Sequence, residues 1–419
     1  MKRRHMTTRG FTMLEMLIAM AITIGIVLFI NQVFSSVKDA VSSGIGLSRV
    51  IQNARVARAQ MTEDARAMVK PSDEGFLMVV NKDMANVYMT PDAATPFAKV
   101  PSDQLCFARL RGDLEPVTPG KTDSISSTSD ANHVKIWYGH ALRLKDDGTD
   151  YTPLKPYLGP TSLNQADPNY YAINWIMGRQ ALFLDEGPNN PQQIYSYGAQ
   201  TDMQIAGYTG EPASDVDDKL YMALTDVSGN VSASGPATLQ DISNDLIVPA
   251  NGGSGGPENA IKYTYVRADQ RLRVNPYPVY KSEDADRQYG AWQLAQTHPY
   301  FVPNVTSIQV EVAADWFDKA NNVEDQQDGL IDTDNQGGII WYSEHHWNSA
   351  IKNRIKTYRA SLGGDTQNAD RLFLWTRDNQ PKWPYLIRVT YRLTDEKGRV
   401  ASQTGLGRMF EVILPVNRN

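Results

Sequence analysis

Residues 11–30 read FTMLEMLIAMAITIGIVLFI, an apolar run that contains a single charged side chain, Glu15. A helix of this length, at about 1.5 Å rise per residue, spans roughly 30 Å, the thickness of the hydrocarbon core of a bilayer. The run follows the basic stretch MKRRHMTTRG, and basic residues favour the cytoplasmic side of a membrane. The sequence therefore predicts a transmembrane helix over 11–34, with residues 1–10 in the cytoplasm and the rest of the chain across the membrane.

Glu15 separates this segment from two simpler alternatives, a cleaved secretory signal peptide and a plain signal anchor. A carboxylate inside a membrane costs about 2.5–3.5 kcal/mol on insertion scales, so it usually has a partner and a function. Cleavage of the chain after Gly10 would create an α-amino group on Phe11, four residues before Glu15. In a helical assembly, that amine on one subunit can neutralise Glu15 of its neighbour and set the axial register.

The stretch RGFTMLEMLIAMAI resembles the prepilin cleavage and methylation motif of type IV pilins and type II secretion pseudopilins. The motif places Gly10 before the cleaved bond, Phe11 at the new N-terminus and Glu15 at the fifth mature position. The resemblance implies a leader over 1–10, a prepilin peptidase as a partner, and N-methylation of Phe11. It also implies a single-pass protein of a bacterial inner membrane with a periplasmic head, assembled with other minor and major pilins or pseudopilins.

The helix is predicted to continue to about residue 69, because apolar residues recur at steps of three and four. Arg49, Gln52, Arg55, Arg58 and Glu63 fall largely between them, and Pro71 ends the pattern. The apolar positions are Val37, Val41, Ile45, Leu47, Val50, Ile51, Ala54, Ala57, Met61, Ala65 and Met68.

Residues 70–419 change to short β-like runs separated by turn-forming clusters, which predicts a large, antiparallel, β-rich head. Together with the long N-terminal helix, this predicts an α+β fold. Polar stretches at 122–132, 214–219 and 251–258 are predicted to be surface loops or insertions. The predicted strands are Phe76–Val80, His133–Tyr138, Ala181–Leu184, Ile261–Val266, Ser307–Val312, Leu372–Trp375, Leu386–Leu393 and Met409–Leu414.

A second resemblance lies in the C-terminal third, where VPNVTSIQVEVAADWF, WPYLIRVTYRLTDEKGRV and FEVILPVN are similar to closing strands of J-type minor pseudopilins. W-type minor pilins share this plan. The resemblance implies a structural subunit at the tip of a pseudopilus or pilus, supporting filament assembly and protein secretion. The alternative is a pilin-anchored adhesin, whose head binds a surface.

Composition and charge disfavour several other classes of function, nucleic-acid binding among them. Hydrophobic residues make up 41% and charged residues 21% of the chain, as in ordinary globular proteins. The net charge is −6, and the first ten residues contribute +4, so the remainder carries −10. Such acidity disfavours nucleic-acid binding, which depends on cationic side chains. Cys106 is the only cysteine, so neither an intramolecular disulfide nor a cysteine-based metal cluster can form within one chain.

One acidic loop, residues 324–335, is a candidate calcium site, because Ca²⁺ prefers several hard oxygen ligands around a flexible turn. Its candidate ligands are Glu324, Asp328, Asp332 and Asp334. The match to an EF-hand loop is degraded, since Asn335 replaces the bidentate Glu at position twelve and a Glu stands at position one. The alternative is a solvated acidic turn without metal.

Three other patterns do not support catalysis, and the chain is predicted not to be an enzyme. GGSGG at 252–256 has the letters of a nucleophile elbow, but it lies in a glycine-rich run closed by Pro257. Gly120-Lys121-Thr122 lacks the earlier glycine of a P-loop. His345 and His346 are adjacent and cannot both face one metal from a regular element, so they are predicted to be packed or partner-facing.

Overall fold

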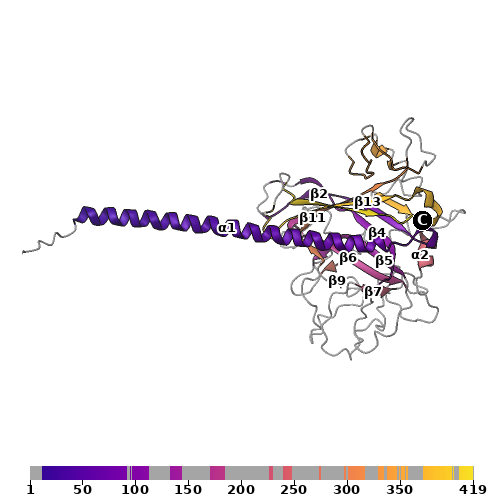
Figure 1. Ribbon diagram of the computed structural model, residues 1–419, viewed down its shortest axis with the longest axis horizontal. Coiled ribbons are helices and arrows are strands. Elements are labelled where there is room, and N and C mark those ends of the chain that lie inside the picture. Colours follow the sequence, from indigo (N-terminus) through magenta and orange to yellow (C-terminus); the bar gives the residue numbers. More distant parts are fainter. Residues whose placement is uncertain are drawn as a thin grey trace, which may run out of the picture. The chain divides into compact units, whose positions relative to one another are not determined.

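The computed structural model describes residues 12–91, 95, 97–112, 133–143, 170–184, 226–229, 239–247, 273–274, 297–298, 301–316, 329–334, 337–346, 349, 351–353, 355–356, 371–398, 400 and 405–418. The chain forms two compact units, Met1–Arg49 and Val50–Asn419. The first contains most of one long helix, and the second contains the end of that helix and every described strand. The fold is α+β with a long apolar N-terminal helix and antiparallel sheets, as the sequence predicts (Figure 1).

Helix α1 covers Met13–Arg66 and ends three residues before the predicted end at residue 69. Its end is set by backbone pairing with strand β4 (Gln104–Leu110). The Val69 N–H donates to the Ala108 carbonyl at 2.9 Å, and the Leu110 N–H donates to the Ala67 carbonyl at 2.8 Å. The chain therefore leaves the helix early because residues 67–69 hydrogen-bond to the last residues of β4.

The last part of α1 packs into the second unit through one face. Val50, Ala54, Ala57, Met61 and Ala65 recur at steps of three and four, and each is at most 5% exposed. Residues at these steps lie on one side of an α-helix, so the observed burial confirms the amphipathic pattern predicted for this half.

The larger sheet has the strand order β10-β6-β5-β4-β1-β12, with antiparallel pairing throughout that path. Three short strands, β7, β8 and β9, join it by parallel pairing. The bounds are β1 Leu77–Asn81, β5 His133–Arg143, β6 Ile176–Leu184, β7 Asp226–Gly229, β8 Arg273–Val274, β9 Thr297–His298, β10 Val302–Pro303 and β12 Arg371–Trp375.

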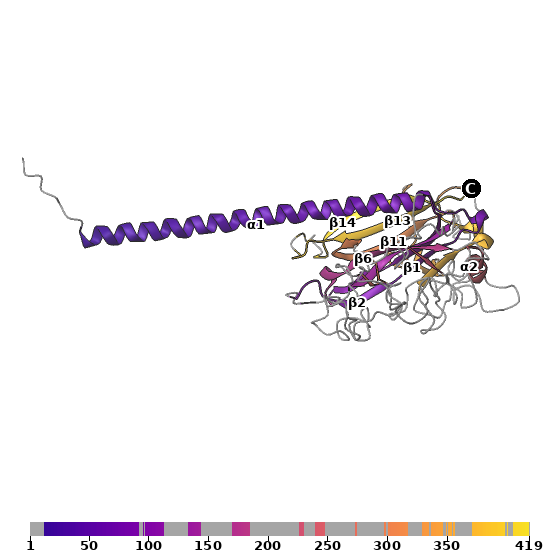
Figure 2. The same cartoon turned by 90° about the horizontal axis from the view of Figure 1, so that it is seen from below.

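A second sheet has the order β11-β13-β14, in which three strands lie side by side (Figure 2). Its strands are β11 Val305–Ala313, β13 Leu386–Leu393 and β14 Arg408–Pro415. Other described elements include the hairpin of β2 and β3, helix α2, and three short 3-10 helices. Their bounds are Asp83–Val87, Phe97–Pro101, Leu239–Leu246, Pro71–Asp73, Ala172–Asn174 and Arg377–Lys382.

Seven of the eight predicted strands coincide with β1, β5, β6, β11, β12, β13 and β14, and the pattern at 386–393 matches β13 at both ends. The eighth, Ile261–Val266, and the loops predicted at 122–132, 214–219 and 251–258 lie outside the described residues. Strands β2, β3, β4, β7, β8, β9 and β10 were not predicted.

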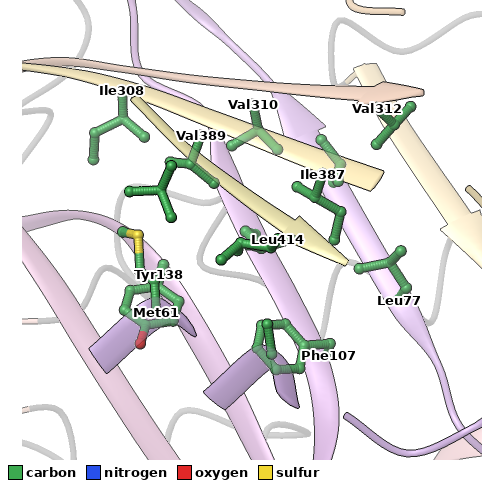
Figure 3. Close-up of a cluster of buried hydrophobic side chains, with 14 of the residues drawn as sticks. Met61, Leu77, Phe107, Tyr138, Ile308, Val310, Val312, Ile387, Val389 and Leu414 are labelled. Carbon is green, nitrogen blue, oxygen red and sulfur yellow. The ribbon is translucent and has the colours of Figure 1, made fainter. Parts of the chain in front are cut away.

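Both sheets and α1 contribute to one apolar core (Figure 3). Met61 of α1, Phe107 of β4, Tyr138 of β5 and Val389 of β13 are all at most 2% exposed in this cluster. Burial of a large apolar side chain stabilises a fold by about 1.5–3 kcal/mol relative to its exposure to water. The core therefore fixes the end of α1 against the strands of the second unit.

Gly407, immediately before β14, requires the conformational freedom of glycine. Its φ is +95°, and an added Cβ would lie 2.4 Å from the Leu393 carbonyl oxygen. We expect Gly407→Ala to lower the free energy of unfolding by about 1–3 kcal/mol, measured by thermal or denaturant unfolding of the full chain in detergent. Gly44→Ala is the control, because nothing lies within 4 Å of an added Cβ in that helical position. Equal stability of the two variants would contradict the expectation.

Candidate functional site: an apolar helix and its single carboxylate

The N-terminal part of α1 exposes an apolar surface on every side. Its eighteen-residue window has a mean hydropathy of 2.5 and is 0% buried, so α1 is the described helix long and apolar enough to span a membrane. Large apolar side chains between Met13 and Phe34 are 44–86% exposed. A helix that is apolar all round is stable in lipid or against other apolar helices, and unfavourable in water.

Two hydroxyl groups in this segment, those of Thr23 and Ser36, are satisfied by the helix itself. The Thr23 hydroxyl donates to the Ala19 carbonyl at 2.8 Å, and the Ser36 hydroxyl donates to the Gln32 carbonyl at 3.0 Å. Internal hydrogen bonds of this kind remove the cost of placing a hydroxyl in an apolar surrounding. The segment also carries a single charge: Glu15 is the one formally charged side chain from Met13 to Val37.

Glu15 lies in the first turn of α1, where it forms a reciprocal cap with Thr12. The Thr12 N–H and hydroxyl donate to Oε2 of Glu15 at 2.8 and 3.0 Å, and the Glu15 N–H donates to the Thr12 hydroxyl at 3.3 Å. This capping box satisfies N–H groups that have no partner within a helix. Within one chain, Glu15 thus stabilises the start of its own helix. Gly10 and Phe11, the two predicted processing residues, lie outside the described residues.

The second unit contains a buried charge cluster centred on Asp64 of α1. Arg179 of β6 donates to both Asp64 oxygens, from Nε at 2.8 Å and from Nη2 at 2.9 Å. Arg109 of β4 and the Tyr138 hydroxyl of β5 also donate to this carboxylate. Burial by itself raises the pKa of Asp64, but its hydrogen bonds and the arginine charges outweigh burial and hold the pKa below its usual value. Asp64 therefore fixes α1 to three strands of the larger sheet.

A second cluster places His345 between two aspartates. Its Nδ1 lies 2.9 Å from Asp83, and its Nε2 lies 2.7 Å from Asp103. Asp103 is 0% exposed and also accepts from the Lys82 and Val310 N–H groups, each at 2.8 Å. Burial lowers the pKa of His345, but the charges and hydrogen bonds of the two aspartates raise it to about 10. Both ring nitrogens face carboxylates, so His345 is packed as a cation, consistent with the packed environment predicted from sequence.

The pH dependence of stability tests this cluster. The pKa of His345 is about 10 in the folded chain, against an ordinary value of 6.5. The stability that protonated His345 contributes is therefore complete below pH 6.5 and is lost as pH rises toward 10. We expect His345→Gln to lower the free energy of unfolding by about 1–3 kcal/mol at pH 6 and by much less at pH 10. Denaturant unfolding across this range gives the difference. A constant difference would contradict the cationic state of His345.

Of the predicted calcium ligands, the structure describes Asp332 and Asp334. Oδ2 of Asp332 accepts from the Trp316 N–H at 2.8 Å and from the Tyr342 hydroxyl at 2.6 Å. Oδ1 of Asp334 accepts from the Gly338 N–H at 2.7 Å and closes a turn. Glu324 and Asp328 lie outside the described residues, among which no group of three acidic, histidine or cysteine side chains could hold a metal. Calcium binding by this loop stays a prediction.

A buried serine and histidine pair was not singled out from sequence. The Ser102 hydroxyl lies 2.7 Å from Nδ1 of His140, and Nε2 of His140 lies 2.9 Å from the Val305 carbonyl. Both side chains are 0% exposed. The contact with Val305 and the burial of the pair are features of a packed polar contact inside the core. The two other motif matches, at 120–122 and 252–256, lie outside the described residues.

The Asp64 cluster was also missed, although the sequence contained a signal. Asp64 stands beside Met61 and Ala65 on the face of α1 predicted to be buried, where a carboxylate requires a partner.

Comparisons of the chain with protein-family models, with curated proteins and with solved structures find no match.

Proposed function

We propose that this chain is a structural minor pilin or pseudopilin subunit, inserted in the inner membrane through α1 and placed near the tip of a periplasmic filament. The observation that carries the proposal is the exposed apolar segment of α1, with Glu15 as its one charge, directly after a Gly10–Phe11 junction. In this role the subunit supports filament assembly and protein secretion, and its contribution is structural.

Physical chemistry supports a partner for this segment. Uncovered apolar surface costs about 25 cal/mol per Å² in water, so a helix exposed on every side favours lipid or neighbouring helices. Inside that environment the Glu15 carboxylate needs a cation. The nearest chemical source is an α-amino group liberated on Phe11 by a prepilin peptidase. An amine from one subunit and the carboxylate of the next then select for ordered assembly.

The head supports a terminal position in such a filament. Residues 50–419 form one compact unit around the end of α1, and long insertions separate the described strands. A large head with insertions would crowd the regular repeat of a shaft, whereas a tip position leaves one side open. The acidic chain, at −10 beyond residue 10, supports protein partners over nucleic acid.

Isolation of the tagged full-length protein from its native membranes tests the proposal. Mild detergent and reversible cross-linking should recover other membrane proteins that carry a Gly-Phe junction followed by an apolar helix with Glu at its fifth position. Recovery should fall when residues 11–34 are replaced by an unrelated transmembrane helix of equal length. Recovery of no such subunit, or equal recovery with the replacement helix, would count against the proposal.

A pilin-anchored adhesin is the second candidate, and one feature of the head favours it. A hollow of about 530 Å³ lies near the C-terminus and is lined by Gln380, Pro381, Tyr385, Val416, Asn417 and Arg418. The guanidinium of Arg418 lies 3.8 Å from the centre of the Tyr385 ring. A tyrosine ring beside amide groups suits sugars, whose C–H faces pack on an aromatic ring and whose hydroxyl groups hydrogen-bond to amides. Glycan-array binding that is lost in Tyr385→Ala would support an adhesin, and absence of any glycan binding would reject it.

A further inference from the structure

The outward side of α1 carries a groove between Arg55 and Arg66. It is an open hollow of about 550 Å³, lined by Arg55, Arg58, Ala59, Thr62, Glu63 and Arg66. These positions recur at steps of three and four, so they follow one side of the helix. The short side chains of Ala59 and Thr62 lie between long charged ones, which makes a channel with a narrow floor and polar walls.

The three arginines of this groove differ from most other arginines in the described part of the chain. The side chains of Arg55, Arg58 and Arg66 form no ion pair or hydrogen bond with a described residue, and all three are exposed. Elsewhere, ion pairs engage Arg109 and Arg179 with Asp64, Arg377 with Glu74, and Arg388 with Glu311. The groove therefore displays three positive charges against one negative charge, on a chain whose net charge is negative.

We propose that this groove receives an acidic helix face of a neighbouring subunit, with carboxylates opposite Arg55 and Arg58. The inference rests on the proposed function, because it names the partner chemistry of the same helix. A row of side chains on one helix fits the groove between rows on another, and a floor of alanine and threonine allows close approach. Guanidinium groups match carboxylates in planar, two-point geometry. Val56, which is 56% exposed beside the groove, adds apolar contact area.

An anionic lipid surface fits this groove less well than a protein helix. Glu63 projects among the arginines and repels phosphate, whereas a helix can set a basic or polar residue opposite it. A net charge of −6 also opposes adsorption of the chain to a negative surface. The shape of the groove, which follows the helix axis over three turns, matches a rod-like occupant.

A photo-cross-linker at Ala59 of the full-length chain, expressed in its native cells, tests the proposal. Ala59 lies in the floor of the groove, so the expected adduct joins it to a second protein. Mass spectrometry should map the adduct to a helix that carries Asp or Glu one turn from the captured residue. An adduct with lipid, an adduct with a protein segment lacking carboxylates, or no adduct at Ala59 would overturn the inference.

The same cross-linker at Ile24, which is 59% exposed in the apolar segment, separates the two proposals. If Ile24 forms an adduct with another subunit and Ala59 forms none, the proposal of an acidic partner in the groove is rejected and the pilin proposal stands. Absence of protein adducts at both positions rejects both proposals.

Charge reversal supplies the matched variants. With the cross-linker at Ala59, Arg55→Glu combined with Arg58→Glu should reduce adduct yield by about tenfold or more, because attraction becomes repulsion. Arg55→Lys combined with Arg58→Lys keeps the charge and should retain most of the yield. Substitution of the mapped partner carboxylates by Lys should restore the yield of the reversed variant. An unchanged yield after reversal contradicts the inference, and an unchanged unfolding temperature shows that the reversed variant remains folded.

Discussion

Replacement of Asp64 by asparagine will lower the free energy of unfolding of the second unit by about 3–5 kcal/mol. Asp64 is 0% exposed and accepts hydrogen bonds from Arg109, Arg179 and Tyr138. Its loss leaves two guanidinium groups, 2% and 6% exposed, without the charge that compensates them. Removal of one member of a buried ion cluster costs more than the cluster contributes, because the remaining charges stay desolvated.

The measurement is denaturant unfolding of the full chain in detergent, followed by tryptophan fluorescence. Glu63→Gln is the matched control, since Glu63 is the exposed neighbour of Asp64 on the same helix, and we expect a change within about 0.5 kcal/mol. The Asp64 cluster also links α1 to three strands, so loss of stability should coincide with faster proteolysis near residue 66. Equal stability of the two variants would contradict the role of Asp64 as the anchor of α1.

If the proposed function holds, replacement of Glu15 by alanine will lower incorporation of the subunit into a filament by about tenfold or more, because it removes the carboxylate proposed to pair with a neighbour's amine. Glu15 also caps its own helix through Thr12, so a loss of assembly could arise from either role. Thr12→Ala separates them. It removes the capping hydroxyl, at a cost of about 1 kcal/mol to the helix start, and leaves the carboxylate in place.

We therefore expect Thr12→Ala to assemble nearly as well as the unaltered chain and Glu15→Ala to fail. Quantitative immunoblotting of sheared filament against membrane fractions gives the incorporated share. A Thr12→Ala defect as large as that of Glu15→Ala would indicate that Glu15 acts only as a capping residue. Normal assembly of Glu15→Ala would show that Glu15 has no function in assembly.

Strand β13, which turns one face away from the core, was predicted at both ends, whereas β1 and β11, which are buried at nearly every residue, were predicted with shifted ends. Along β13, exposure alternates between half-buried and buried at every residue, and both its limits were predicted. Along β4, six successive residues from Gln104 to Arg109 are buried, because the larger sheet is covered on both faces. Burial on both faces removes the period of two on which strand prediction depends. Strand β3 ends in Pro101, a residue that is read as a breaker in sequence.

The charged clusters lay beyond sequence reasoning for a different reason. Asp64 meets Arg109 across 45 positions and Arg179 across 115, and His345 meets Asp103 across 242. A sequence gives the type of each residue but not the register that brings distant strands together. The burial of Asp64 could be predicted from the helical spacing of the apolar residues around it, whereas its partners could be identified only from the fold.

The intact mass and N-terminal peptide of the native protein, isolated from its own membranes, test the central claim most directly. The account predicts a chain that lacks residues 1–10 and begins at Phe11 with a methyl group on its α-amine. In the proposed assembly, only that cleavage supplies the amine that neutralises Glu15. A native chain that still carries residues 1–10, or one cut at a distant site beyond residue 11, would contradict the account.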